Sequence, residues 1–372
     1  MDNLRLSCLA CSVKTEQAKQ TFSRDMRVMI NRFLVFSILN LTLFVIPICH
    51  GEQLNAYELC ILERVKGSGS IDTAETIKKE CRKHAENEKK QKLSSVDIPI
   101  KESGVLTQRL RKEQQTEFEP YVITPHRRNY IQPMLTTNDI NHEQYAQIEG
   151  YERHLEDYEA KFQLSLKVPL SKSSLLFEED KLYFGFTIQS WWQIYSDGIS
   201  KPFRETNYMP EIVYAIKTDW EPFNANTGVI FGAEHLSNGR SQLLSRSWNR
   251  LYTQFVVEKG SWVFSLKPWV RLQEDAKENP IASRGDDNPN IEDYVGNYEF
   301  SAGYNDGQFE YGFRLNHAIE TGRGSAEVSF SFPLWGKFYG YASVFTGYGE
   351  SLIDYNHKQT RFGLGIALNN LL

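Results

Sequence analysis

From residue 161 onward, apolar and polar residues alternate along the chain in short segments that are separated by turn residues. Within 162–168, every second residue is apolar, so the apolar side chains share one face of a strand. Similar segments begin at Leu182, Ile212, Val229, Asn249, Trp262, Tyr298, Phe309, Val328, Tyr339 and Phe362. The pattern predicts about ten clear strands, with room for two more near 201–208 or in the tyrosine- and proline-containing stretch 119–159.

The opposite faces of several segments carry charged residues, among them Glu299, Glu310, Arg314 and Glu327. A water-soluble sandwich would have to bury its aromatic faces against each other, and aromatic residues make up 13% of the chain. A transmembrane barrel instead turns apolar faces to lipid and polar faces to a water-filled interior. This alternation also accounts for a mean hydropathy of −0.47. The sequence therefore predicts an all-β fold, a transmembrane antiparallel β-barrel with its lead-in segment over 119–372, and a soluble sandwich as the alternative.

Residues 1–51 are predicted to be a leader that contains a signal peptide. Two arginines precede the apolar run 33–48, and small residues after this run offer a cleavage site behind Gly51. The run is too short for a typical membrane-spanning helix. Translation from Met26 or Met29 would give a shorter leader with the same signal. The mature chain is therefore expected outside the cytoplasm.

Residues 52–118 are predicted to form a small helical hairpin and a polar linker. The first helix covers about 54–66 and the second about 72–92, with glycines and serines between them. Once the leader is removed, Cys60 and Cys81 are the cysteines that remain. An even pair in an oxidising compartment suggests a disulfide, which would hold together a hairpin too small for a core of its own. The region is either a periplasmic docking element or a decoration without activity.

Candidate chemistry lies in the hairpin predicted around residue 242. His235 and Ser237 are two positions apart, so both side chains point to the apolar face of their strand. In such a hairpin, Asn249 lies opposite His235 and Ser247 lies opposite Ser237. An imidazole that takes the proton of a serine, and a third polar group that fixes the ring, form a serine hydrolase site. The alternative is a polar hairpin end whose histidine and serine merely bond to water.

The residues around this hairpin belong to a longer series of motifs. They are H-L-S-N-G-R-S at 235–241 with S-R-S-W-N-R-L-Y-T at 245–253, S-W-W-Q at 190–193, P-F-R-E-T-N-Y at 202–208, K-P-W at 267–269, D-D-N-P at 286–289 and T-G-Y-G-E-S-L-I-D-Y-N at 346–356. In this order the motifs resemble those of the outer-membrane phospholipase A family. The similarity runs from about residue 119 to the C-terminus and leaves out the N-terminal third.

The resemblance implies a barrel of twelve antiparallel strands in the bacterial outer membrane. It also implies hydrolysis of the acyl ester bonds of phospholipids and lysophospholipids, of phospholipase A1 and A2 type, by a calcium-dependent enzyme that is active as a homodimer. By match to the family, Ser237 is the nucleophile, His235 the general base and Asn249 the group that orients the imidazole. The backbone amide of Gly239 matches the donor that stabilises the oxyanion.

The resemblance further implies where calcium binds. The Ser245 hydroxyl and the Arg240 carbonyl match the ligands of the catalytic ion, together with the Ser200 carbonyl from the neighbouring subunit. These are the hard oxygen donors that calcium prefers. Asp287 matches an acidic position of a second calcium site. Gln242, however, stands where the family has the other aspartate of that site, so this chain departs from the family there.

Other classes of function remain open from the sequence. Lysine and arginine total 42 against 47 aspartates and glutamates, for a net charge of −5, and nothing in this balance indicates nucleic acid binding. The same fold would serve a catalytically silent pore or structural barrel, in which the His-Ser pair is incidental. A third possibility is an adaptor that acts through the Cys60 to Cys81 hairpin.

Overall fold

The computed structural model describes residues 56–67, 75, 77–84, 104–146, 148–279 and 281–372. The chain divides into two compact units, Met1–Asp97 and Ile98–Leu372. The predicted leader 1–51 and its cleavage site lie outside the described residues. None of the described helices is long and apolar enough to cross a membrane.

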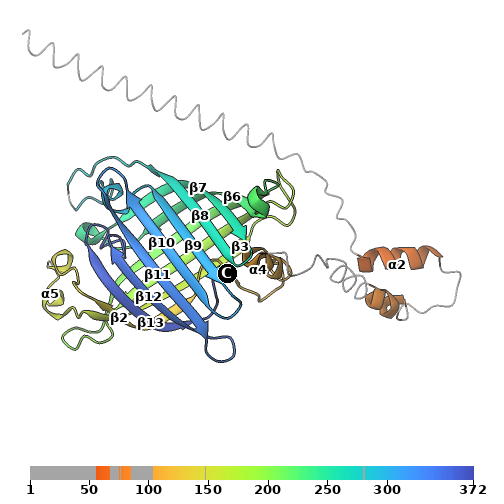
Figure 1. Cartoon of the computed structure of the whole chain (residues 1–372), viewed down its shortest axis with the longest axis horizontal. Coiled ribbons are helices and arrows are strands. Elements are labelled where there is room, and N and C mark those ends of the chain that lie inside the picture. The colour runs from red at the N-terminus through yellow and green to blue at the C-terminus, as the bar shows by residue number, and fades with distance from the viewer. Residues whose placement is uncertain (1–55, 68–74, 76, 85–103, 147, 280) are drawn as a thin grey trace, which may run out of the picture. The chain divides into compact units, whose positions relative to one another are not determined.

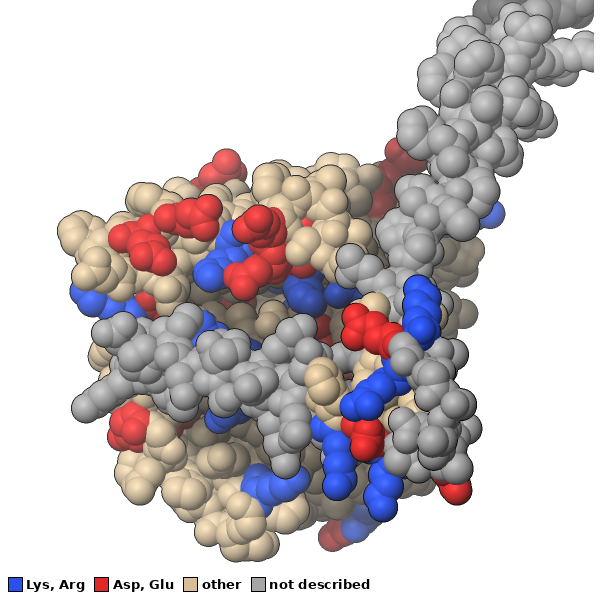
Figure 2. Space-filling view, turned by 90° about the vertical axis from the view of Figure 1, so that its right-hand side faces the viewer, with Lys and Arg blue, Asp and Glu red and all other residues tan. Residues whose placement is uncertain are grey.

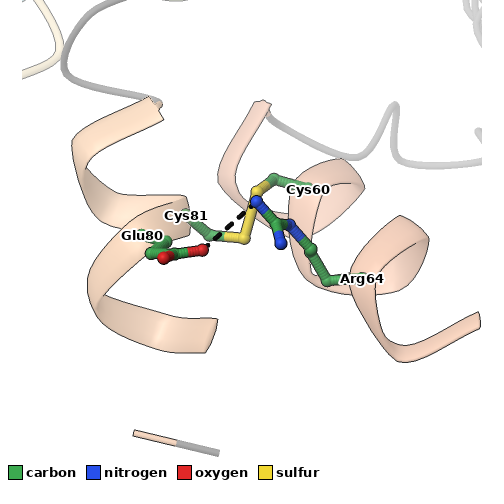
Figure 3. The surroundings of a disulfide bond; sticks show 4 residues. All are labelled: Cys60, Arg64, Glu80 and Cys81. Carbon is green, nitrogen blue, oxygen red and sulfur yellow. Dashed lines mark ion pairs between the residues drawn. A yellow bond between two sulfur atoms is a disulfide. The ribbon is translucent and has the colours of Figure 1, made fainter. Parts of the chain in front are cut away.

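The N-terminal unit contains helix α2 (Ala56–Gly67) and a second helical segment that includes 77–84. A disulfide joins Cys60 in the first helix to Cys81 in the second, with the two Cα atoms 5.6 Å apart (Figure 3). Beside it, Arg64 and Glu80 form an ion pair of 3.2 Å. The predicted bridge is therefore present in the structure, and the continuation of the second helix toward residue 92 lies outside the described residues.

Twelve strands, β2 to β13, form a closed antiparallel barrel, in which each strand pairs with the next and β13 pairs with β2 (Figure 1). Their bounds are β2 Tyr130–Thr137, β3 Tyr158–Pro169, β4 Lys181–Trp192, β5 Phe203–Thr218, β6 Asn226–Ser237, β7 Ser247–Lys259, β8 Trp262–Leu272, β9 Tyr298–Asn305, β10 Glu310–Ala318, β11 Arg323–Pro333, β12 Tyr339–Gly347 and β13 Gln359–Ala367. The two-residue strand β1 (Thr124–Pro125) also pairs with β3 but is not one of the twelve barrel strands. The structure thus confirms the all-β barrel and its twelve strands.

The two places where extra strands were allowed behave differently. The stretch 119–159 does contain one barrel strand, β2. The stretch 201–208 is not a strand of its own, because its residues from Phe203 onward are the beginning of β5. The remaining eleven barrel strands coincide with the segments in which apolar residues alternate.

The barrel has an apolar outer wall and a packed polar interior. On the outer wall, the side chains of Phe231 and Leu251 are 47% and 44% exposed. Inside, the Arg204 guanidinium bonds to both oxygens of Glu159 at 2.9 and 3.0 Å and to Asp354 at 2.9 Å, and all three residues are fully buried. Around Arg204, the prediction of a water-filled interior is therefore wrong, because paired charges fill the space that water was expected to occupy.

Helix α4 (Val105–Gln114) packs on the barrel end that also holds the C-terminus (Figure 1). The Val105 amide donates to the Gly260 carbonyl at 3.0 Å, and the Thr107 amide donates to a Glu258 carboxylate oxygen at 2.9 Å. The prediction of a linker up to residue 118 is wrong over 105–114, because these residues form a helix that packs on the barrel. Because α4 has few apolar residues, polar contacts hold it on the barrel.

Short helices occupy the connections between strands. They are η1 Glu143–Tyr145, α5 Tyr151–His154, η2 Pro222–Asn224, η3 Gln242–Leu244 and α6 Glu292–Val295. The longer connections, including 138–157 and 273–297, lie at the barrel end remote from α4 and the C-terminus. Figure 2 looks at the side of the molecule that faces right in Figure 1, where Lys and Arg side chains are interspersed with Asp and Glu side chains and with other residues.

Candidate active site

The predicted catalytic hairpin is formed by β6 and β7 at the end of the barrel that has the longer connections. Its register places His235 opposite Asn249 and Ser237 opposite Ser247, and residues 238–246 connect the strands. This is the predicted pairing. His235 is exposed on the outer wall, whereas its neighbour Glu234 points inward and is buried. The candidate chemistry therefore lies on the apolar outer face of the barrel.

A hydrogen bond of 2.7 Å joins His235 Nδ1 to Asn249 Oδ1. An amide oxygen only accepts, so in this assignment Nδ1 carries the proton and Nε2 is left to act as a base. Ser237 lines the same cavity of ≈440 Å³ as His235 and Gly239. Among the described residues no hydrogen bond joins His235 to Ser237, and such catalytic contacts often tighten only when substrate binds.

Gly239 has a backbone conformation that favours glycine. Its φ is +63°, in the left-handed region where a side chain is strained. A Cβ at this position would also lie 3.3 Å from Cε2 of Tyr208. Glycine therefore lets the backbone of the turn lie open to the cavity.

The loop after Ser237 is organised by Asn238, a buried residue that the sequence analysis did not single out. Its Oδ1 accepts from the amides of Arg240 at 3.2 Å and Arg246 at 3.0 Å, and its Nδ2 donates to the Leu244 carbonyl at 2.8 Å. One side chain thus closes both ends of the loop that carries the predicted calcium ligands. The Asn-Gly pair was the available signal, but it indicated only a turn.

The residues expected to hold the catalytic calcium are partly assembled in this chain. Arg240, Ser245 and Asp287 line the cavity that contains His235. Ser245 Oγ donates to Asp287 Oδ2 at 2.7 Å. Ser200 lies in the β4–β5 connection and is not among the lining residues. A hydroxyl and a carbonyl oxygen are donors that fit a hard cation.

The second calcium site does not fit the residues present. Gln242 replaces the expected aspartate, and Lys277 forms an ion pair with Asp287 Oδ1. Both partners of this pair are largely buried. Over the described part of the chain, no three His, Cys, Asp or Glu side chains gather in a way that would hold a metal ion. An ammonium group therefore already neutralises the carboxylate that a second ion would need.

A further polar residue, also not predicted, contacts Asn249 from the other side. Asn249 Nδ2 donates to Glu274 Oε1 at 3.0 Å. Asn249 pairs with Leu272, the last residue of β8, and Glu274 follows two positions later on the same outward side. Register counting across β7 and β8 would have found this carboxylate, but the end of β8 cannot be placed from alternation alone.

Comparison with known proteins decides the family. A family model described as Phospholipase A1 matches residues 106–368, which is more than half of the chain. The chain belongs to the phospholipase A1 family. This confirms the resemblance seen in the motifs and extends the matched region back to α4.

Relatives in the phospholipase A1 family are similar over most of their length. The phospholipase A1 of Escherichia coli K12 is 38% identical over 277 residues, which is 74% of this chain and 90% of the relative. That of Salmonella typhimurium is 37% identical over the same shares. The N-terminal hairpin with its disulfide lies outside the residues that the family model matches.

Solved structures of the family share the barrel. An active-site mutant of outer membrane phospholipase A from Escherichia coli superposes with a TM-score of 0.65 at 36% identity, covering 73% of this chain and all of that one. A Salmonella typhi outer membrane phospholipase dimer with bound calcium gives a TM-score of 0.63 at 37% identity, covering 70% and 97%. The chain described here is thus an outer-membrane barrel of the same architecture.

Proposed function

We propose that this chain is an outer-membrane serine hydrolase that cleaves acyl ester bonds of phospholipids and lysophospholipids. The observation that carries the proposal is the bond between His235 and Asn249 on the outer wall, because His235 also lines the cavity that Ser237 and Gly239 line. Buried polar groups in this barrel pair with each other, whereas these side chains face the surroundings of the barrel. The family membership supports the same reaction class.

The reaction follows from the groups present. His235 Nε2 takes the proton of Ser237 Oγ while the oxygen attacks the ester carbonyl, and the backbone amide of Gly239 stabilises the oxyanion. The imidazolium then returns the proton to the leaving glycerol oxygen, and a lysophospholipid departs. Water then gives one proton to His235 while its oxygen attacks the acyl carbon bound to Ser237. The imidazolium returns this proton to Ser237 Oγ as the bond to the acyl carbon breaks and the fatty acid leaves. Asn249 holds the ring in the required tautomer throughout.

The position of the site suits an ester at the membrane boundary. In outer-membrane barrels the turns on the periplasmic side are short and the external loops are longer. The catalytic hairpin ends among the longer connections, so it lies at the level of the outer leaflet. Phe231 and Leu251 extend the outer face below it. Acyl chains can therefore stay in apolar surroundings while the ester reaches Ser237.

Calcium and a second copy of the chain complete the proposed site. The Ser245 hydroxyl and Arg240 carbonyl would hold one ion with the Ser200 carbonyl of a neighbouring copy, and the bound ion would favour negative charge at the oxyanion. A convex wall offers no deep pocket, so two barrels side by side would form the clefts for acyl chains. A monomer, fixed as such in detergent, that hydrolyses phospholipid as fast as the dimer would contradict this role of the dimer.

The pore alternative meets an obstacle in the interior. Glu159, Arg204 and Asp354 are fully buried in their mutual ion pairs. A channel wide enough for solutes would leave such side chains in contact with water. The packed interior therefore favours the enzyme over the pore.

The test uses purified protein in mixed micelles of phospholipid and detergent. Ser237→Ala should abolish calcium-stimulated release of fatty acid, and EDTA should abolish it in the unmodified protein. Ser241→Ala is the matched control, because Ser241 lies in the same loop, is exposed and makes no side-chain cap. Heat-modifiable migration in gel electrophoresis shows whether each variant is folded. An unmodified folded protein without hydrolysis would instead support the silent barrel.

A further inference from the structure

The orienting group of the proposed triad is an amide, and an amide has two different ends. If its oxygen faces the imidazole, the ring is protonated on Nδ1 and Nε2 is free to take the serine proton. If its NH₂ faces the imidazole, Nδ1 becomes the acceptor and the proton sits on Nε2, where it blocks the base. By itself, the Asn249 amide can adopt either orientation, so a second contact is needed to favour one of them.

A hydrogen bond between Asn249 and Glu274 favours the first orientation. Glu274 Oε1 lies 3.0 Å from Asn249 Nδ2, and the Asn249 oxygen lies 2.7 Å from His235 Nδ1. A carboxylate only accepts hydrogen bonds, so it accepts from the NH₂ end and repels the oxygen end. The oxygen is thereby directed at the imidazole, which is the state that leaves Nε2 free.

The same contact supplies a charge that the amide lacks. An acidic third member stabilises imidazolium directly, whereas a neutral amide does not. A carboxylate bonded to the NH₂ end polarises the amide, which strengthens the bond from its oxygen to the ring. The other charged side chains lining the cavity are Arg240 and Arg246 from the hairpin loop and Arg284 and Asp287 from the β8–β9 connection.

We propose that Glu274 is a positioning residue that orients and polarises Asn249, so that the site works as a chain of four groups: Ser237, His235, Asn249 and Glu274. This inference rests on the proposed hydrolase function. Glu274 contacts Asn249, and Asn249 in turn contacts the His235 imidazole. Glu274 is therefore expected to affect the rate of the chemical step and not the binding of lipid.

The test compares Glu274→Gln with Glu278→Gln, which removes the same charge from an exposed position in the same connection. Steady-state hydrolysis of a phospholipid in mixed micelles with saturating calcium gives kcat and KM over a range of pH. Glu274→Gln should lower kcat about three- to tenfold, the size expected for one partly exposed charge-assisted hydrogen bond, and leave KM unchanged. Glu278→Gln should match the unmodified protein.

A double-mutant cycle separates positioning from a general structural effect. In the Asn249→Ala background, Glu274→Gln should have no further effect on kcat, because the amide through which it acts is absent. Glu274→Asp, which keeps the charge, should recover part of the lost rate. Heat-modifiable migration checks that every variant is folded.

Three results would overturn the proposal while leaving the hydrolase intact. They are an unchanged kcat in Glu274→Gln, an equal loss of rate in the Asn249→Ala background, and a raised KM at constant kcat, which would indicate contact with the lipid headgroup. If the unmodified protein itself releases no fatty acid, the proposed function fails instead. The two failures are therefore distinguishable.

Discussion

Polar side chains have opposite environments on the outer wall at His235 and in the interior at Arg204. Inside the barrel, Arg204 has ion pairs with Glu159 and Asp354, and Arg361 also pairs with Glu159. On the outer wall, His235 bonds to Asn249 and has an open side toward the cavity. Buried charges in this network are paired with each other, since unpaired burial is costly. The imidazole of His235, by contrast, keeps a side open to the cavity where the wall is apolar and exposed.

The reactive part of this molecule is therefore neither its most buried nor its most charged region. The strongest ionic network lies in the interior, remote from any substrate that is a lipid. The proposed triad of Ser237, His235 and Asn249 consists of uncharged side chains, and the Glu274 carboxylate lies behind it. Changes in the two regions should consequently separate activity from stability, and the following experiments test that separation.

The largest expected effect is on activity alone. His235→Ala should reduce fatty-acid release at least about a thousandfold, since the nucleophile loses its base. The urea midpoint of unfolding should hardly change, because an exposed side chain with one hydrogen bond is removed. Activity is measured in mixed micelles and unfolding by tryptophan fluorescence. A variant that instead unfolds at much lower urea would break the distinction between wall and interior.

The second effect is on stability. Glu159→Gln leaves the buried Arg204 and Arg361 with only Asp354 and weaker partners nearby, so the free energy of unfolding should fall by about 3–5 kcal/mol. Specific activity of the folded fraction should stay close to normal. Glu278→Gln, at an exposed position, is the control for the loss of one carboxylate. Equal stability of the two variants would mean that the interior network is not what holds the barrel.

A third experiment concerns the cation at Asp287. We expect the unmodified protein to lack the second calcium site, because Lys277 neutralises Asp287. The double substitution Gln242→Asp with Lys277→Ala should create one further calcium site, with a Kd of about 10⁻⁴ to 10⁻³ M. Equilibrium dialysis with radioactive calcium counts the ions per chain. Gln242→Asp alone, which keeps the ammonium group, should add none, and extra binding in that control would contradict the role of Lys277.

The smallest effect concerns α4 at the opposite end of the barrel. Burial acts to raise the pKa of Glu113, but Arg109 and Lys167 outweigh it, and the pKa is lowered below its usual 4.5. A carboxyl whose pKa is lowered on folding stabilises the docked helix above its ordinary pKa, and this contribution is lost as pH falls below it. The effect should be only about 0.2–1 kcal/mol. The protection factors of the α4 amides, which correct for the slower intrinsic exchange at low pH, should fall on acidification of the unmodified protein, and this fall should shrink in Glu113→Gln.

Alternation of apolar residues was sufficient to predict most of the barrel and the pairing of His235 with Asn249. It failed at β2, where Pro133 and a register irregularity between Gln132 and Leu135 interrupt the period of two. It also failed at α4, whose docking depends on polar contacts with Gly260 and Glu258 rather than on an apolar stripe.

The packed interior was beyond local sequence patterns for a different reason. Arg204 and Asp354 are 150 residues apart in the chain, and only closure of the barrel brings them together. The sequence alone therefore predicts that inward-pointing charges are solvated. The contact of Glu274 with Asn249 is not predictable from local patterns either, because it depends on where β8 ends.

The most direct test of the account measures what surrounds the face that carries His235. A nitroxide attached at Ala233→Cys, on the same face of β6, is compared in lipid bilayers with one at Gln254→Cys, which points inward and bonds to Ser265 at 3.1 Å. We predict that the label at 233 is relaxed strongly by lipid-soluble oxygen and weakly by a water-soluble nickel chelate, and that the label at 254 is shielded from oxygen. A label at 233 that responds to the chelate but not to oxygen would place the triad inside the barrel and contradict the account.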